Sequence, residues 1–182
     1  KRAFAGTGNA SYGYFGGGYS GPSQTTTIDR LDYSNDTSTS LKGPLSIQRV
    51  HHSAVGNASF GYFAGGETPS EVTSKVDRVD YSNDTATASS KGPLSAVRAR
   101  HGATGDTNYG YFGGGLAPSQ TSSIDRLDYS SDTTTAAPKG LLTATNRNLM
   151  GASPQANSLG STTVYPWYDT SGRGNNANIT DS

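Results

Sequence analysis

The sequence has no cysteine, one methionine and one tryptophan among its 182 residues. The missing cysteine excludes disulfide bonds and thiolate metal sites. No run approaches the roughly 18 apolar residues that a membrane-spanning helix needs, so we expect no membrane insertion. Charged residues are also scarce, at 15%, and 14 Lys and Arg balance 14 Asp and Glu. This balance argues against nucleic acid as a partner, because tracking phosphates needs a basic face.

Helical periodicity is missing as well. No segment repeats apolar residues at three- and four-residue spacing, which predicts almost no helix. Only 31% of the residues are hydrophobic, but the net charge of +0 differs from the high net charge that is typical of disordered chains. The polar residues are mainly Gly, Ser, Thr and Asn, which favour turn-rich β structure. We therefore expect an all-β fold.

What the sequence does contain is an internal repeat. A segment with the pattern Tyr/Phe-Gly-Tyr-Phe-Gly/Ala-Gly-Gly occupies residues 12–18, 60–66 and 109–115, so its copies start 48 and 49 residues apart. The segments between the copies repeat with it. A period of this length with four short strands in each copy is typical of the blades of a β-propeller.

The four strands of the third copy are expected at residues 98–105, 109–115, 124–129 and 133–137. The third strand is the most regular, and its other copies occupy 28–33 and 76–81. Turns rich in Asn and Asp follow it, and these side chains bond their own backbone in hairpin turns. Neither face of the third strand is cleanly polar, which indicates a strand covered on both sides. We therefore expect Arg30, Arg78 and Arg126 to pair with nearby Asp side chains or turn carbonyls and to set the register between blades.

Together these features resemble the kelch repeat, in which a double glycine, a tyrosine, an arginine and a histidine follow one another. The matching residues are Gly16-Gly17, Gly65-Gly66 and Gly113-Gly114, then Tyr33, Tyr81 and Tyr129, then Arg49 and Arg98, then His52 and His101. The kelch tryptophan is replaced by Thr39, Thr87 and Thr135, which implies a thinner and more polar blade. Among kelch-like proteins, the repeated segments are similar to those of virion proteins of marine phages, particularly cyanophages.

The resemblance covers residues 1–153 and implies about three kelch-like four-stranded blades of 48–49 residues, in a β-propeller or in an open array completed by partner chains. Residues 154–182 lack the repeated pattern, and we expect a capping or docking strand followed by a flexible tail. Kelch-type rings usually hold five to eight blades, so three blades leave open edges that pair with other chains. The chain also starts within a repeat, which fits a processed product or a piece of a longer array.

The positions expected to hold the repeat together are structural rather than ligand-binding, because function rarely needs three equal copies. They are Gly16, Gly17, Gly65, Gly66, Gly113, Gly114, Arg30, Arg78, Arg126, Asp32, Asp80, Asp128, Tyr33, Tyr81 and Tyr129.

The function expected from the resemblance is that of a non-enzymatic structural or adhesion component of a phage virion or extracellular filament. Its partners would be copies of itself or neighbouring virion or filament proteins, and its location the virion or the extracellular space. The alternative is a carbohydrate-binding propeller module that attaches to host-surface glycans. No catalytic residues and no cofactor are expected, because no Ser/His/Asp order or pair of catalytic carboxylates is visible; the two glutamates, Glu67 and Glu71, share one loop.

Candidate binding residues are few. Tyr19, Tyr165, Trp167 and Tyr168 have the amphipathic rings that stack on sugars, and they serve equally well in an interchain contact. The histidines His51, His52 and His101 suggest either the start of a metal site or, as we favour, ordinary kelch-position histidines packed in the blade. The group Asp32, Asn35 and Asp36 has the composition of a calcium loop without its glycine and terminal glutamate, which favours a hairpin turn.

Overall fold

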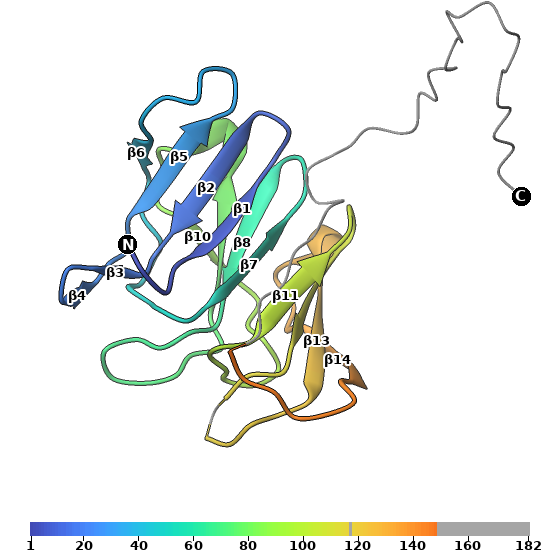
Figure 1. The fold of residues 1–182 in the computed structure, drawn as a ribbon. Helices are drawn as coiled ribbons and strands as arrows, with labels where there is room; N and C mark the ends of the chain where they lie inside the picture. The colour runs from blue at the N-terminus through green and yellow to red at the C-terminus, as the bar shows by residue number, and fades with distance from the viewer. Residues whose placement is uncertain (117, 149–182) are drawn as a thin grey trace, which may run out of the picture.

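The computed structural model describes residues 1–116 and 118–148, which form three four-stranded antiparallel sheets and one two-stranded hairpin (Figure 1). Sheet 1 has the strand order β1 (Ala5–Gly8), β2 (Tyr12–Gly16), β5 (Ile28–Asp32) and β6 (Ser40–Lys42). Sheet 2 contains β7 (Ser53–Gly56), β8 (Phe60–Ala64), β9 (Val76–Asp80) and β10 (Ser89–Lys91). Sheet 3 contains β11 (Gly102–Gly105), β12 (Tyr109–Gly113), β13 (Ser123–Asp128) and β14 (Ala137–Leu141). The hairpin pairs β3 (Tyr19–Ser20) with β4 (Ser23–Gln24) in the loop after β2.

The expected all-β class and the four strands per repeat are confirmed. Within the described ranges the helical content is two short 3-10 turns, η1 (Tyr81–Asn83) and η2 (Tyr129–Ser131). The register is the same in every sheet, because Tyr14 lies opposite Arg30, Tyr62 opposite Arg78 and Tyr111 opposite Arg126. The sheets form an open array, and residues 1–116 and 118–148 contain no closed ring of sheets.

The first and fourth strands start later than the sequence expectation, whereas the starts of the second and third strands agree with it to within one residue. The first strand of sheet 3 begins at Gly102 instead of residue 98, because the preceding residues form a loop that carries the buried Arg98. The fourth strands begin at Ser40, Ser89 and Ala137, three to four residues later than expected. The turn after the third strand accounts for this second shift, since it continues through the Thr-rich residues before the chain pairs back onto the sheet. The expected boundary at residue 153 and the C-terminal segment 154–182 lie outside the described residues.

The core lies between neighbouring sheets. One cluster joins sheets 1 and 2 and includes Tyr14, Ile28, Leu45, Phe63 and Val79. The second joins sheets 2 and 3 in the same way and includes Tyr62, Val76, Leu94, Phe112 and Leu127. The first strands of the three sheets, β1, β7 and β11, lie side by side (Figure 1). Each sheet therefore buries apolar surface only against its neighbours, as in repeat proteins whose units cannot bury that surface alone.

Glycine is needed just after the second strand of each sheet. Gly17 and Gly18 have φ of 64° and 87°, and the equivalent pairs are Gly65-Gly66 and Gly114-Gly115. This left-handed backbone costs other residues energy but suits glycine. The equivalences place Gly16 and Gly113 inside their strands, where sheet 2 has Ala64. The left-handed pair thus starts one residue later in sheets 1 and 3 than the kelch match suggested.

Candidate functional site at the sheet interfaces

A buried arginine–aspartate pair anchors the connection from sheet 1 to sheet 2. Arg49 Nη2 lies 2.9 Å from Asp77 Oδ2, and both side chains are fully buried. Arg49 Nη1 donates to the carbonyls of Phe63, Gly65 and Lys75, at 3.3, 3.2 and 2.8 Å. Ser46 donates its amide and hydroxyl to the two Asp77 oxygens, at 2.9 and 2.7 Å. The buried charges are therefore paired and hydrogen-bonded, as burial of a charge requires.

Sheet 3 repeats this arrangement. Arg98 Nη2 lies 3.3 Å from Asp125 Oδ2, and Ser95 donates to both oxygens of that aspartate. In sheet 1 the arginine position is taken by Lys1, whose ammonium lies 2.7 Å from Asp29 in a partly exposed pair. Sequence reasoning identified Arg49 and Arg98 but missed the aspartates. The signal that could have found them is the recurrence of Asp29 at Asp77 and Asp125, each 48 residues apart.

A second aspartate joins each pair of neighbouring sheets. Asp84, at the end of η1 in sheet 2, accepts hydrogen bonds from two side chains of sheet 1, Tyr14 at 3.0 Å and Arg30 at 2.7 Å, and forms an ion pair with a third, Lys42, at 3.3 Å. Burial, and then the hydrogen bond to Asp84, raises the pKa of Tyr14. The phenol therefore keeps its proton and donates a hydrogen bond to this carboxylate.

The next interface has the same parts. Asp132 of sheet 3 accepts hydrogen bonds from Tyr62 at 3.0 Å and Arg78 at 2.7 Å, and forms an ion pair with Lys91 at 3.5 Å. Ring stacking accompanies the ion pairs: Tyr81 lies over Tyr14 with centroids 4.7 Å apart, and Tyr129 lies over Tyr62 at 4.9 Å. The pairing expected for Arg30 and Arg78 is present, and in both cases the partner lies on the next sheet.

The sheets also approach each other through backbone. Gly43 donates its amide to the Asp84 carbonyl at 2.8 Å, and Gly92 does the same to Asp132. A Cβ on Gly43 would lie 1.9 Å from the Ala86 carbonyl oxygen, and one on Gly92 equally close to that of Thr134. Real atoms cannot approach so closely, so glycine is needed where one sheet meets the next.

The two histidines that were expected to pack in the blade are buried between sheets. His52 and His101 are 6% and 2% exposed and lie near the rings of Phe63 and Phe112. Burial, and next the nearby Arg98 charge, lowers the pKa of His101 to about 3, and burial also lowers that of His52. Both rings are therefore neutral at pH 7.

His51 is only partly buried, and its Nδ1 lies 3.2 Å from Glu67 Oε2. Within the described residues no three His, Asp or Glu side chains gather as metal ligands would. Asp32 accepts from the amide and hydroxyl of Ser34, as in the hairpin turn that we favoured.

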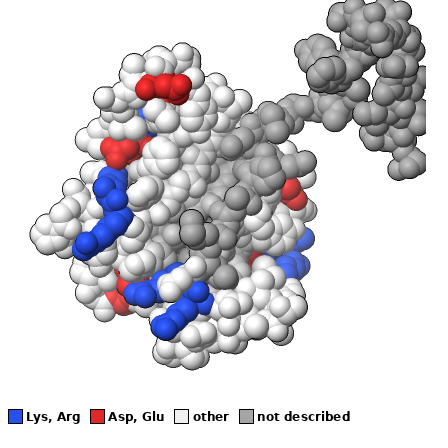
Figure 2. All heavy atoms as spheres, viewed as in Figure 1, with Lys and Arg blue, Asp and Glu red and all other residues white. Residues whose placement is uncertain are grey.

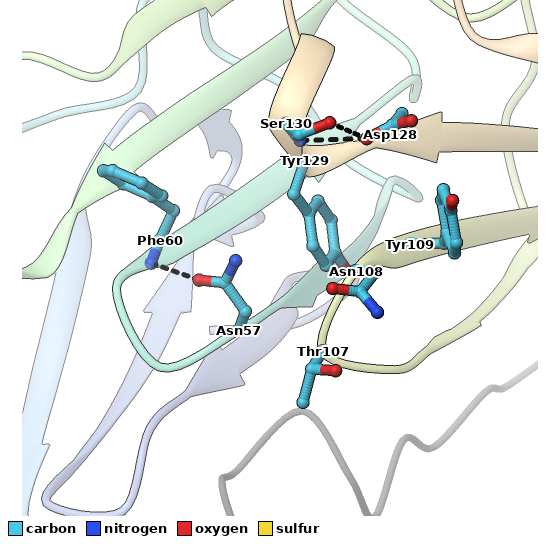
Figure 3. Close-up of a pocket in the computed structure, with 8 residues that line it drawn as sticks. All are labelled: Asn57, Phe60, Thr107, Asn108, Tyr109, Asp128, Tyr129 and Ser130. Atoms are coloured by element: carbon cyan, nitrogen blue, oxygen red, sulfur yellow. Dashed lines mark hydrogen bonds between the residues drawn. The ribbon is translucent and has the colours of Figure 1, made fainter.

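A shallow cleft of about 320 Å³ opens at one end of the interface between sheets 2 and 3 (Figure 3). Its lining residues are Asn57, Phe60, Thr107, Asn108, Tyr109, Asp128, Tyr129 and Ser130. Figure 3 shows the ring of Tyr129 between Asn57 and Phe60 on one side and Asn108 and Tyr109 on the other. At the equivalent place between sheets 1 and 2, Asn9 donates to the Ala58 carbonyl at 3.4 Å, which ties the two loops together. The cleft combines the edges of aromatic rings with amide and carboxylate groups. Such groups suit a polar, ring-shaped ligand, because the aromatic rings pack against its ring and the polar groups hydrogen-bond its substituents.

Of the four residues predicted to bind a ligand, the one that the structure describes, Tyr19, does not line this cleft. Tyr19 belongs to the β3–β4 hairpin, at the opposite end of the second strand, and the Arg2 guanidinium covers its ring at 4.9 Å. Tyr165, Trp167 and Tyr168 lie outside the described residues. Sequence reasoning missed the cleft, because its lining comes from loops that are about 50 residues apart in the chain.

Comparison with protein-family models and with curated proteins finds no match. On the face shown in Figure 2, Lys and Arg groups alternate with Asp and Glu groups among mostly uncharged residues.

In the described part of the chain, no helix is long and apolar enough to cross a bilayer. The best-developed feature is thus the interface between sheets, which occurs twice with the same contacts.

Proposed function

We propose that this chain is a non-enzymatic structural or adhesion component of a virion or extracellular filament, and that its kelch-like blades assemble with further copies or with a neighbouring protein. The observation that carries the proposal is the sheet interface, which occurs twice, with the three contacts of Asp84 repeated at Asp132 to within 0.2 Å. Chemistry at a unique site needs a unique cluster, whereas assembly is served by equal copies. Within this proposal each sheet is one blade of a propeller or of an open array.

The number of sheets supports assembly. The described residues form three four-stranded sheets, fewer than the roughly four to eight blades of a closed propeller. Tyr33 of sheet 1 is 45% exposed, although its counterparts Tyr81 and Tyr129 are covered by a neighbouring sheet. Another chain, or further blades, can pack onto an uncovered sheet face of this kind.

Solution mass and electron microscopy of the purified chain test the proposal. We expect either rings of about six sheets built from two chains or longer periodic filaments. A monodisperse monomer over the whole accessible concentration range would overturn the assembly function.

The cleft supports a second candidate, a carbohydrate-binding module for attachment to cell-surface glycans. Tyr109 and Tyr129 supply aromatic surface there, and Asn57 and Asn108 supply amides that hydrogen-bond hydroxyl groups. A glycan array with the intact chain is the test, with Asn108→Ala as the cleft variant and Ser59→Ala, at the equivalent place between sheets 1 and 2, as the control. Binding that Asn108→Ala weakens and Ser59→Ala leaves unchanged would favour this candidate, and an array without signal would argue against it.

A further inference from the structure

We infer that the outer face of sheet 3 docks onto the outer face of sheet 1 of a second copy of this chain, through the same contacts that join the sheets within one copy. The inference rests on the proposed assembly function and specifies its contact surface. The outer face of sheet 3 is defined by Tyr111, Arg126, Lys139 and Gly140, and that of sheet 1 by Tyr33 and Asp36.

The outer face of sheet 3 has the donors of an interface without the acceptor. Tyr111 and Arg126 lie opposite each other as Tyr14 and Arg30 do in sheet 1, and Lys139 precedes Gly140 as Lys42 precedes Gly43. The Arg126 guanidinium lies 4.3 Å from the centre of the Tyr109 ring, as Arg78 does over Phe60. Among the described residues, Arg126 and Lys139 form no ion pair. The arginine is therefore already placed for an aspartate that residues 1–116 and 118–148 do not supply there.

The outer face of sheet 1 has the acceptor without the donors. Asp36 is the counterpart of Asp84 and Asp132, which are both 7% exposed, yet Asp36 is exposed and forms no ion pair in the part of the chain described. Beside it, Tyr33 exposes 45% of its surface, whereas Tyr81 stacks on the ring of the preceding sheet. The two outer faces therefore complement each other in charge and in ring stacking.

One identical segment shows what the neighbouring sheet does. Residues 32–37 and 80–85 both read Asp-Tyr-Ser-Asn-Asp-Thr. In sheet 2, which has a neighbour, the segment forms the 3-10 turn η1 and Asp84 has φ of −75°. In sheet 1, whose turn has no preceding sheet to contact among the described residues, the turn is not 3-10 and Asp36 has φ of 49°. Since the sequence is the same, the difference follows from the contacts that Asp84 makes and Asp36 lacks.

The glycine of the close approach is also present at the open end. Gly140 is the counterpart of Gly43 and Gly92, whose Cβ positions would meet the backbone of the next sheet at 1.9 Å. A Cβ on Gly140 would meet nothing within 4 Å, and φ there is not in the left-handed region. Nothing within the described chain requires glycine at this position. It fits a sheet that approaches from outside.

A second copy is the occupant that these observations favour, because its own sheet 1 carries both the acceptor Asp36 and the ring of Tyr33. The two faces differ from each other, so the contact is head-to-tail and leaves a free face at each end. Copies that join in this way form a closed ring or a filament, depending on whether the rotation closes.

Sedimentation velocity of the intact chain with three variants tests the inference. Asp36→Lys places a like charge against Arg126 and Lys139, and Gly140→Val blocks the approach on the opposite face. We expect each to raise the dissociation constant of self-association at least about thirtyfold. As the control, Asn35→Lys adds a charge at the position directly before Asp36. Its counterpart Asn83 is exposed in η1, so this variant should leave association unchanged.

Sedimentation of a mixture of the two face variants gives a more decisive test. Asp36→Lys retains a native sheet 3 face and Gly140→Val retains a native sheet 1 face, so an equimolar mixture should form dimers and nothing larger, while each variant alone stays monomeric. Circular dichroism melting of each variant shows that the fold is kept. If the wild-type chain assembles and both variants assemble equally well, the docking surface is wrong and the assembly function stands. If the wild-type chain is a monomer, both are overturned.

Discussion

The Arg49 guanidinium lies 2.9 Å from the Asp77 carboxylate, and neither side chain reaches solvent. The pair connects the loop that leaves sheet 1 to the third strand of sheet 2, and Ser46 occupies the remaining carboxylate positions. The pair therefore fixes this loop on sheet 2, because a loop that moved away would leave two buried charges without partners.

Removing one member of this pair should be costly. We expect Asp77→Ala to lower the free energy of unfolding by about 3–5 kcal/mol, because it leaves a buried arginine without its counter-charge. Asp29→Ala, which breaks the partly exposed pair with Lys1, should cost about 1 kcal/mol or less. Urea unfolding at pH 7 measures both. Equal losses for the two variants would show that burial is not what makes the Arg49–Asp77 pair important.

The identical turns of sheets 1 and 2 offer a matched pair of substitutions. Asp84→Asn removes the charge that faces Arg30 and Lys42, and we expect a loss of about 1.5–3 kcal/mol. Asp36→Asn changes the same residue in the same local sequence, and in the monomer it should stay within about 0.5 kcal/mol of wild type. The measurement is urea unfolding at a concentration where the chain is monomeric. A similar loss at Asp36 would mean that the turn itself, rather than the contact between sheets, needs the carboxylate.

Alanine at two equivalent glycines should give opposite results. Gly92→Ala forces the backbone of sheet 3 away from a contact that would otherwise be 1.9 Å, and we expect a loss of about 3 kcal/mol. For a chain of this size that corresponds to a melting temperature lower by about 6–12 °C. Gly140→Ala meets open space and should leave the melting temperature of the monomer unchanged or slightly higher. Thermal melts of both variants decide this, and a loss at Gly140 would contradict the open face.

Stability should fall below pH 6.5 because of the buried histidines. The pKa of His101 is about 3 in the folded chain against 6.5 as its ordinary value, and that of His52 is shifted in the same direction. As the pH falls below 6.5 the unfolded chain gains protons that the folded chain does not, so up to about 1.4 kcal/mol per pH unit is lost for each ring. Above pH 6.5 this contribution is constant.

The His101→Asn variant isolates one of these rings. Urea unfolding between pH 6 and pH 5 should show a slope that is smaller than that of wild type by up to about 1.4 kcal/mol per pH unit, whatever the variant does to stability at pH 7. An unchanged slope would show that His101 takes up its proton in the folded chain.

Much of the fold was determined by the sequence alone. The Tyr-Gly-Tyr-Phe segments and the Ile/Val-Asp-Arg segments recur at 48- or 49-residue spacing, and their alternation indicates strands, so the three sheets and their second and third strands could be predicted. The fourth strands were placed too early, because Thr37 and its counterparts have high β propensity but belong to the turn. The roles of Asp77 and Asp84 were missed because each bonds residues 28 to 70 positions away, which no local pattern reveals.

Only the tertiary structure decided which of the equivalent residues have partners. Tyr33 and Tyr81, or Asp36 and Asp84, are indistinguishable in local sequence, yet one of each pair is exposed and the other packs against a neighbouring sheet. The physical reason is that a strand segment determines which side chains it presents, whereas burial and pairing depend on the sheet that approaches from elsewhere in the chain. The repeat therefore determined the contact surfaces, and the three-dimensional arrangement determined which of them remain open.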